Sequence, residues 1–178
     1  MKNSYVLFVK TGFEERIVRL LKKRLVSSLF SPYVLTKETL FRKKGETIKS
    51  VEIYFRGYVF IDSELGTEDF VFEISPYIMK IEGIYQIVNY GNKSDIVISE
   101  RERTMLKNLF GINHCIGSSK GLIVGDRIKI NEGPLIGFEN IIKKINRHKR
   151  QAVIEIDMLG EVRQLTVSLE IVEKIPIG

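Results

Sequence analysis

The sequence predicts an α+β protein in which an N-terminal α/β sandwich domain is followed by a small β-barrel. In the first part of the chain, runs typical of strands alternate with segments whose apolar residues recur every three to four positions. In the last part only short strand patterns occur, separated by turn sequences such as EGP, RHKR and LGE. We expect one domain over residues 1–110, a linker over 111–120 and a second domain over 121–178.

The first domain begins with a predicted strand over 4–10, rich in Val, Leu and aromatic residues. A helix is predicted over 13–25, because one face collects apolar residues at helical spacing: Ile17, Leu20, Leu21 and Leu25. Thr11 is the expected N-cap, and Glu14 three residues later would complete a capping box.

Three more strands are predicted in this domain, over 33–44, 47–62 and 83–88, with a polar turn at Lys43 to Glu46 between the first two. The pair Arg56–Gly57 should mark a bend or bulge, because glycine inside a strand pattern usually does. We expect mostly antiparallel pairing of these strands.

Two further helices are predicted. One begins at Gly66 and should end near Ser75–Pro76, because the residue before a proline is disfavoured in the helical conformation. The other covers 98–110, where Ser99 and Glu102 form a capping box and an apolar face follows from Met105, Leu106 and Leu109.

The second domain follows a segment, GINHCIGSSK, that breaks the pattern with Gly, Ser and Asn. Short strands are then predicted over 125–131, 139–146, 152–158 and 162–175. Ile154 and Ile156 alternate with Glu155 and Asp157, so one face should be core and the other wet.

Composition favours a non-enzymatic protein with an anionic partner. The formal net charge is +6, and a basic balance favours nucleic acid. No phosphate-binding glycine loop and no catalytic or zinc-binding motif occurs, so we expect no catalytic residue, no metal and no cofactor. Cys115 beside His114 could suggest a metal site or a catalytic nucleophile. Two adjacent residues cannot form a tetrahedral metal site alone, so a structural role is favoured. A single cysteine and the lack of any long apolar run predict a cytoplasmic protein without membrane contact.

A cluster of positive charge occupies 143–150, which contains no acidic residue. It could be a solvated turn, but its place at a strand end makes it a rigid platform for nucleic-acid phosphates. Residues on neighbouring strands could extend it. The candidate RNA-binding residues are Lys143, Lys144, Arg147, His148, Lys149, Arg150, Arg127, Lys129 and Arg163.

An aromatic group is the second candidate surface. IYFRGYVFI places Tyr54, Phe55 and Tyr58 close together, with Phe8 on the first strand possible as a neighbour. Aromatic residues in strands are usually buried, so a core role is the alternative. At a bend, such a group could instead form a patch that docks a protein.

The stretches YVLFVKTGFEERIVRLL, FRGYVFI, ISERE and VGDRIKINEGPLIGF, in this order, resemble the NusG-like transcription elongation factors over residues 4–175. The resemblance implies an N-terminal NGN domain followed by an SH3-like KOW barrel. It also implies a monomer that binds the clamp helices of the largest subunit of bacterial RNA polymerase, with Phe8, Phe55, Arg56 and Tyr58 at the matching positions.

Departures from the housekeeping pattern favour a specialised member. The housekeeping factor usually has Phe-Pro-Gly-Tyr, where this chain has Phe55, Arg56, Gly57 and Tyr58, so Arg56 replaces the proline. Asn140 stands where the barrel motif usually has a glycine, and Asn tolerates the positive φ that glycine would adopt there. Lys143 and Lys144 stand where acidic residues are common. The barrel sequence is most similar to that of the LoaP group, which implies processive antitermination on particular operons, with a nascent leader RNA hairpin bound by the barrel. The alternative is a general NusG factor whose barrel recruits a protein such as Rho or a ribosomal protein.

Overall fold

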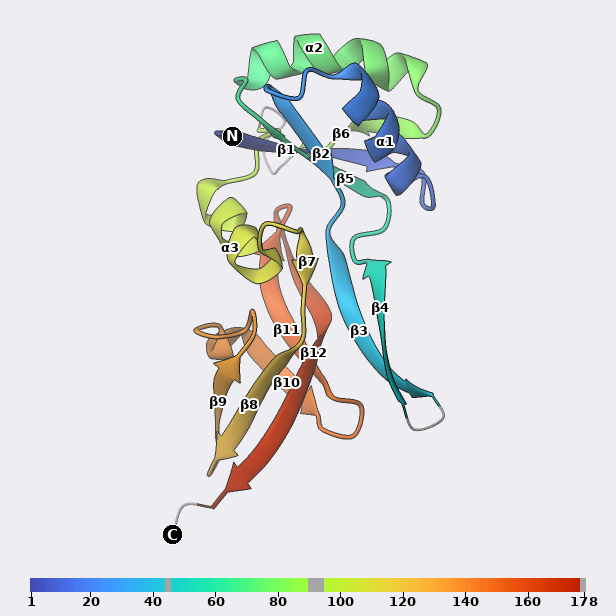
Figure 1. Ribbon diagram of the computed structural model, residues 1–178. Coiled ribbons are helices and arrows are strands. Elements are labelled where there is room, and N and C mark those ends of the chain that lie inside the picture. Colours follow the sequence, from blue (N-terminus) through green and yellow to red (C-terminus); the bar gives the residue numbers. More distant parts are fainter. Residues whose placement is uncertain (44–45, 90–94, 177–178) are drawn as a thin grey trace. The chain divides into compact units, whose positions relative to one another are not determined.

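The computed structural model describes residues 1–43, 46–89 and 95–176. Its contacts divide the chain into two compact units (Figure 1). The first consists of Met1–Leu35 and Ile53–Thr104, and the second of Thr36–Glu52 and Met105–Gly178. The expected fold class is confirmed, since the described residues form three helices and several sheets in an α+β arrangement, and the last part of the chain is built of strands.

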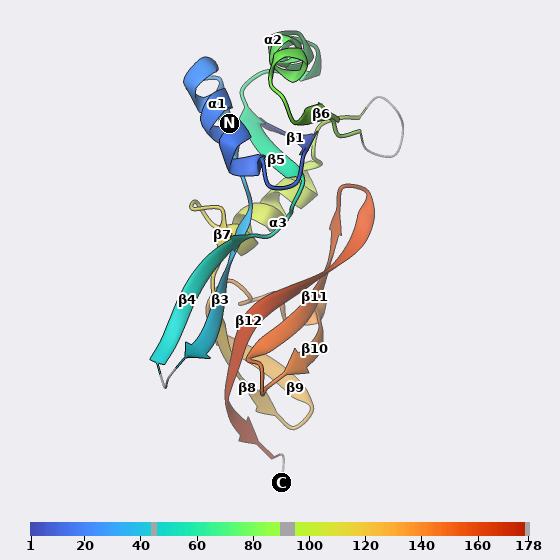
Figure 2. The ribbon, with the colours of Figure 1, turned by 90° about the vertical axis from the view of Figure 1, so that its right-hand side faces the viewer.

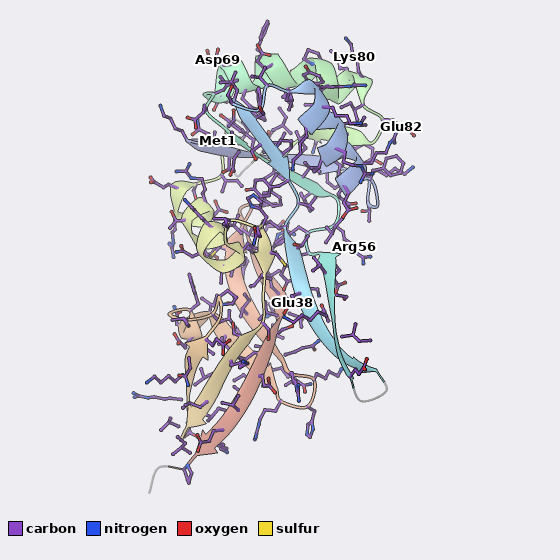
Figure 3. The ribbon with its side chains drawn as sticks, in the orientation of Figure 1. Met1, Glu38, Arg56, Asp69, Lys80 and Glu82 are labelled. Atoms are coloured by element: carbon purple, nitrogen blue, oxygen red, sulfur yellow. The ribbon has the colours of Figure 1, made fainter. Side chains whose placement is uncertain are left out.

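The first unit is a four-stranded antiparallel sheet in the order β2-β5-β1-β6. Its strands are β1 (Asn3–Val9), β2 (Phe30–Tyr33), β5 (Tyr58–Ser63) and β6 (Ile84–Ile87). Helices α1 (Glu14–Arg24) and α2 (Thr67–Lys80) lie on the same side of this sheet (Figures 1 and 2). Figure 3 shows Asp69 near the beginning of α2 and Lys80 at its end, which suits the helix dipole.

The core of the first unit lies between these helices and the sheet. Alternate residues of β1 face it, and the Tyr5 ring stacks on that of Phe70 from α2 with centroids 3.6 Å apart. The fully buried members from the helices and central strands are Tyr5, Leu7, Val9, Ile17, Leu21, Val59, Ile61, Phe70 and Ile74. The expected apolar face of α1 is thus confirmed for its buried positions.

Two predicted helix boundaries are wrong. α1 begins at Glu14, and Phe13 occupies the N-cap position without a side-chain hydrogen bond, so Thr11 is not the cap. α2 continues through Pro76 to Lys80. Pro76 is exposed, and it lacks only the one N–H that would bond to the carbonyl of Phe72, whose side chain also faces solvent.

Helix α3 (Glu100–Phe110) begins as predicted. The backbone N–H of Glu102 donates to Ser99 Oγ at 3.2 Å, and the N–H of Ser99 donates to Glu102 Oε2 at 3.2 Å. This reciprocal pair is a capping box. On the predicted apolar face Leu106 and Leu109 are buried, while Met105 is only half-buried.

The described residues of the second unit form two sheets. One has the order β4-β3-β7, from β3 (Thr36–Lys43), β4 (Glu46–Ile53) and β7 (Cys115–Ile116). The other has the order β10-β11-β12-β8-β9 and includes one parallel pair, β12 with β8. Its strands are β8 (Ser119–Val124), β9 (Arg127–Glu132), β10 (Ile142–Asn146), β11 (Gln151–Met158) and β12 (Glu161–Ile175).

The expected linker is partly regular structure. β7 pairs in parallel with β3, and the backbone carbonyl of His114 accepts hydrogen bonds from the N–H of Thr36 at 2.9 Å and from its hydroxyl at 3.1 Å. From β12, the Ser168 hydroxyl donates to the carbonyl of Glu38, labelled on β3 in Figure 3, at 2.9 Å. These contacts explain why 36–52 groups with the C-terminal strands. The domain boundaries at 110 and 121 stay a prediction.

Three smaller expectations have different outcomes. Asn140 lies in a single 3-10 turn, η1 (Glu139–Ile141), and is not among the residues with positive φ, so the glycine-like role expected of it is wrong. On strand β11, Ile154 and Ile156 are buried as predicted. The polar turn between β3 and β4 includes residues 44–45, which lie outside the described residues. No helix in the described part of the chain is long and apolar enough to cross a membrane.

Candidate functional site

An aromatic cluster lies where the inner strands β1 and β5 end beside the edge strand β6, and it consists of Phe8, Tyr58 and Tyr85. Phe8 is directly opposite Tyr58 in the β1–β5 register, and their ring centroids are 5.7 Å apart. The Tyr85 ring lies 5.4 Å from that of Phe8. Phe8 is 39% exposed and Tyr85 57% exposed. Three touching rings that remain open to solvent are the kind of surface on which another protein docks.

Tyr85 was not among the predicted site residues. Leu7 pairs with Ile87 and Phe8 with Gln86, but Val9 pairs with Ile84, so Tyr85 is the extra residue of a β-bulge. A bulge re-aims a side chain that regular alternation would place elsewhere. The only local signal for it was an aromatic residue beside the glycine in GIYQIV.

Phe55 differs from the other predicted docking residues because it is only 6% exposed. Its ring packs against Tyr54 and Phe60, with centroids 5.3 and 6.1 Å away. The expectation that Phe55 presents its ring on the surface is therefore wrong for this structure, and the core interpretation holds. Burial also raises the pKa of the neighbouring Tyr54 hydroxyl.

The predicted bend is a turn over 55–58. The N–H of Tyr58 donates to the carbonyl of Phe55 at 3.3 Å, and Gly57 has φ +83°. A positive φ at the third position is typical of a type II turn, which explains why glycine is needed there while the second position tolerates Arg56. Arg56 is exposed and lies on the loop between β4 and β5 (Figure 3).

Glu14 fastens this turn to the β1–α1 loop. The Glu14 side chain is 1% exposed, and both of its carboxylate oxygens are hydrogen-bonded. Oε2 accepts the N–H of Gly12 at 2.7 Å, and Oε1 accepts the N–H of Gly57 at 2.7 Å. The carbonyl of Gly57 in turn accepts the N–H of Val9 at 2.8 Å. One buried carboxylate thus fixes both chain segments that flank the aromatic cluster, at the strength of charge-assisted hydrogen bonds.

The basic segment lies where predicted, at the turn between β10 and β11. The N–H of Lys149 donates to Asn146 Oδ1 at 3.0 Å, and the N–H of Arg150 donates to the carbonyl of Arg147 at 3.2 Å. Arg150 has φ +52°, and its carbonyl accepts the N–H of Leu169 from β12 at 2.9 Å. The turn is therefore held on one side by the Asn146 side chain at the end of β10 and on the other by a backbone hydrogen bond to β12, as the platform interpretation requires.

Two of the predicted cations are neutralised by neighbours. Lys143 pairs with Glu155 at 3.5 Å, and Arg150 with Glu170 at 3.4 Å. No ion pair within 4 Å joins the other four residues to any part of the chain that the structure describes. We name these exposed residues the cationic turn: Lys144, Arg147, His148 and Lys149.

A bulge contributes to this arrangement. Ile142 pairs with Ile154 and Lys144 with Val153, so Lys143 is an extra residue in β10. Consecutive residues of a regular strand face opposite sides, whereas here both lysines are exposed.

The other three predicted RNA-binding residues lie elsewhere. Arg127 and Lys129 are on β9, at the opposite end of the strand order from β10, and Arg127 shares a row with Val124 and Ile175. Along β12, Ile175 in that row lies about 20 Å from Ser168, which pairs with Gln151 next to the cationic turn. Arg163 is five residues before Ser168 on β12, roughly 17 Å away in the other direction. The expectation that these residues extend the basic patch is wrong, because it required a strand order that the sequence did not reveal.

An open pocket of about 420 Å³ adjoins the cationic turn. Its lining combines basic, acidic and apolar side chains from the turn and from β12: Arg147, His148, Arg150, Glu170 and Ile171. No group of three or more His, Cys, Asp or Glu residues that could hold a metal ion occurs among residues 1–43, 46–89 and 95–176.

Comparison with known proteins agrees with this architecture. Residues 2–107 match the protein family described as "Transcription termination factor nusG". The chain is 24% identical to the transcription termination/antitermination protein NusG of Halalkalibacterium halodurans, over 98% of this chain and 99% of that protein. It is 24% identical to the protein of the same name from Buchnera aphidicola, over 97% and 96% of the two chains. The NusG protein of Neisseria meningitidis serogroup B is 23% identical over 98% of both.

Proposed function

The chain belongs to the NusG family, and from that premise we propose that it is an operon-specific elongation and processive antitermination factor of the LoaP type. In this proposal the first unit docks on RNA polymerase and the C-terminal strands bind a hairpin in the nascent leader RNA. Members of the family are transcription factors that bind RNA polymerase and are not enzymes. We propose that this one acts as a cytoplasmic monomer.

The aromatic cluster supports polymerase docking. Phe8 and Tyr85 are exposed and Tyr58 is half-buried, and the hydrogen bond from Gly57 to Glu14 fixes the turn that leads into Tyr58. Because the surface is preorganised, little conformational freedom is lost on binding. We propose that these three residues and Arg56 contact the clamp helices of the largest subunit, while the buried Phe55 supports them.

The cationic turn is the observation that carries the RNA proposal. Lys144 near the end of β10, and Arg147 and Lys149 on the turn that follows, form no ion pair with any residue that the structure describes, and hydrogen bonds tie the turn to its own strand and to β12. Each cation that contacts a phosphate releases counterions, so affinity comes from these residues and weakens with salt. A hairpin of base-paired RNA would be read mainly through its shape, bulges and loop.

A general NusG factor is the second candidate, because the relatives that match almost the full length carry the name transcription termination/antitermination protein NusG. The pairing of Lys143 with Glu155 and of Arg150 with Glu170 also reduces the net charge of the basic segment. In that case the C-terminal strands would recruit a protein such as Rho or a ribosomal protein, and the cationic turn would be a solvated surface.

A transcription assay separates the two candidates. Bacterial RNA polymerase transcribes a template with an intrinsic terminator downstream of a candidate leader, with and without the protein. We expect readthrough to rise only when the leader hairpin is intact, and the double variant Lys144→Glu with Arg147→Glu to lose this rise while it still binds polymerase.

The matched control is Lys143→Glu, because this lysine lies in the same strand but is already paired with Glu155. It should lower the readthrough less than the double variant does. Readthrough that rises equally on templates with an intact and a scrambled hairpin would contradict the operon-specific proposal and favour the general factor.

A further inference from the structure

The pocket beside the cationic turn has a composition that phosphate binding alone does not explain. Arg147 and His148 come from the turn, while Glu170 and Ile171 come from β12. At about 420 Å³ the pocket falls within the roughly 300–1,000 Å³ range of small-ligand sites. It is therefore large enough for one nucleobase but not for a stretch of duplex.

Glu170 is the residue that needs an explanation. Its carboxylate lies 3.4 Å from the guanidinium of Arg150 and lines the pocket. A carboxylate repels phosphate, so it lowers affinity at a surface that only holds an RNA backbone. On an unpaired base, however, a carboxylate can accept hydrogen bonds from ring and amino N–H groups.

The four bases differ in what they offer to a carboxylate. Guanine presents two adjacent donors, N1–H and N2–H, which match both oxygens of one carboxylate. Adenine and cytosine each present an amino donor next to an acceptor nitrogen, and uracil presents one N–H between two carbonyls. Two parallel charge-assisted bonds are the strongest arrangement, so a carboxylate favours guanine over the other three bases.

The remaining lining supplies what a bound base also needs. Ile171 offers apolar surface to the face of the base, and the His148 ring can stack on it. Arg147 lines the pocket at its turn side, where the phosphates of the same and the next nucleotide would lie. Arg150 holds Glu170 in place through their ion pair.

We propose that this pocket binds one unpaired guanine of RNA, with Glu170 accepting hydrogen bonds from its Watson–Crick edge. The inference rests on the proposed RNA-binding function and names the nucleotide that the second unit reads. A guanine in the loop or a bulge of a hairpin would enter the pocket, while the cationic turn holds the adjoining backbone.

The test uses the full chain and fluorescein-labelled RNA pentanucleotides that differ only in the central base: UUGUU, UUAUU and UUIUU, where I is inosine. Fluorescence anisotropy should show UUGUU bound about tenfold more tightly than UUAUU, the discrimination typical of a bidentate contact. Inosine lacks the N2 amino group, so UUIUU should fall between them.

The variant Glu170→Gln should bring the UUGUU and UUAUU affinities within about twofold of each other, because an amide cannot accept from both donors. Glu173→Gln is the matched control, since this exposed carboxylate lies on the same strand but does not line the pocket. It should keep the preference for guanine.

Equal binding of UUGUU and UUAUU by the unaltered chain would overturn the inference, as would a preference that survives Glu170→Gln. Absence of measurable binding to any pentanucleotide would overturn it too. Binding of a leader hairpin that is sensitive to Lys144→Glu with Arg147→Glu, but without any guanine preference, would refute the pocket alone and leave the proposed function standing.

Discussion

Replacing Glu14 with Gln should destabilise the first unit by about 2–4 kcal/mol, a large effect for a change of one atom. In the structure the two carboxylate oxygens accept the N–H groups of Gly12 and Gly57, each at 2.7 Å, at a side chain that is 1% exposed. Gln keeps one acceptor and turns an N–H₂ group toward the other N–H. One charge-assisted bond, about 1.5–3 kcal/mol, is lost, and a buried donor is left without its acceptor.

The assay is urea denaturation followed by far-UV circular dichroism, with Glu15→Gln as the matched control. Glu15 is exposed, and its ion pair with Arg19, at 4.0 Å, is also exposed to solvent and therefore weak. Its replacement should change the free energy of unfolding by about 0.5 kcal/mol or less. In the Glu14→Gln variant, the amide of Gly57 should also exchange with solvent faster. A Glu14→Gln variant as stable as the Glu15→Gln variant, with unchanged exchange at Gly57, would refute the role assigned to this carboxylate.

Three further predictions concern other parts of the molecule. Phe8→Ala should weaken polymerase binding at least about tenfold with little loss of stability, because Phe8 is exposed. Phe55→Ala should instead lower the free energy of unfolding by about 3–5 kcal/mol, because Phe55 is buried in the core. A pull-down with polymerase and a denaturation curve of each variant check this, and the reverse pattern would contradict it. Gly133→Ala should unfold or severely destabilise the C-terminal strands, because Gly133 has φ +97° and an added Cβ would lie 2.5 Å from the carbonyl oxygen of Ser118. A melting temperature within about 2 °C of that of the unaltered protein would count against this prediction. The pKa of Glu139 is lowered by hydrogen bonds from its own backbone N–H and from those of Ile130 and Gly137, against an opposing effect of burial. The ionised Glu139 therefore stabilises the fold at pH values above the pKa of an unfolded Glu, and this stabilisation is lost as the pH falls through the lower pKa of the folded state. Glu139→Gln should flatten this loss of stability at acidic pH, and an unchanged loss would exclude Glu139 as its source.

The sequence was most informative where both partners of an interaction are close along the chain. Ser99 and Glu102 are three residues apart, and their capping box formed as predicted. Glu14 has the same spacing from Thr11, but its carboxylate turned to Gly57, which is 43 residues away. Local pattern cannot reveal a competing partner of that kind.

The candidate surfaces show the same limit. The basic segment is contiguous, so the cationic turn was found from the sequence, and Phe8 and Tyr58 came from two recognisable strands. Tyr85 was missed because a bulge changed its direction. Arg127 and Arg163 were wrongly joined to the basic patch, because the parallel pairing of β12 with β8 sets the strand order and depends on residues about 50 positions apart.

The central claim is that this chain reads a particular RNA through its cationic turn. Its most direct test is an anisotropy titration of the full chain with leader-RNA hairpins from neighbouring operons, at two salt concentrations, with the Lys144→Glu, Arg147→Glu double variant alongside. The account predicts submicromolar binding to one hairpin and not to its scrambled form, and a loss of that binding in the variant together with a shallower salt dependence. Weak binding to every RNA, equal for the variant and abolished by salt, would contradict it.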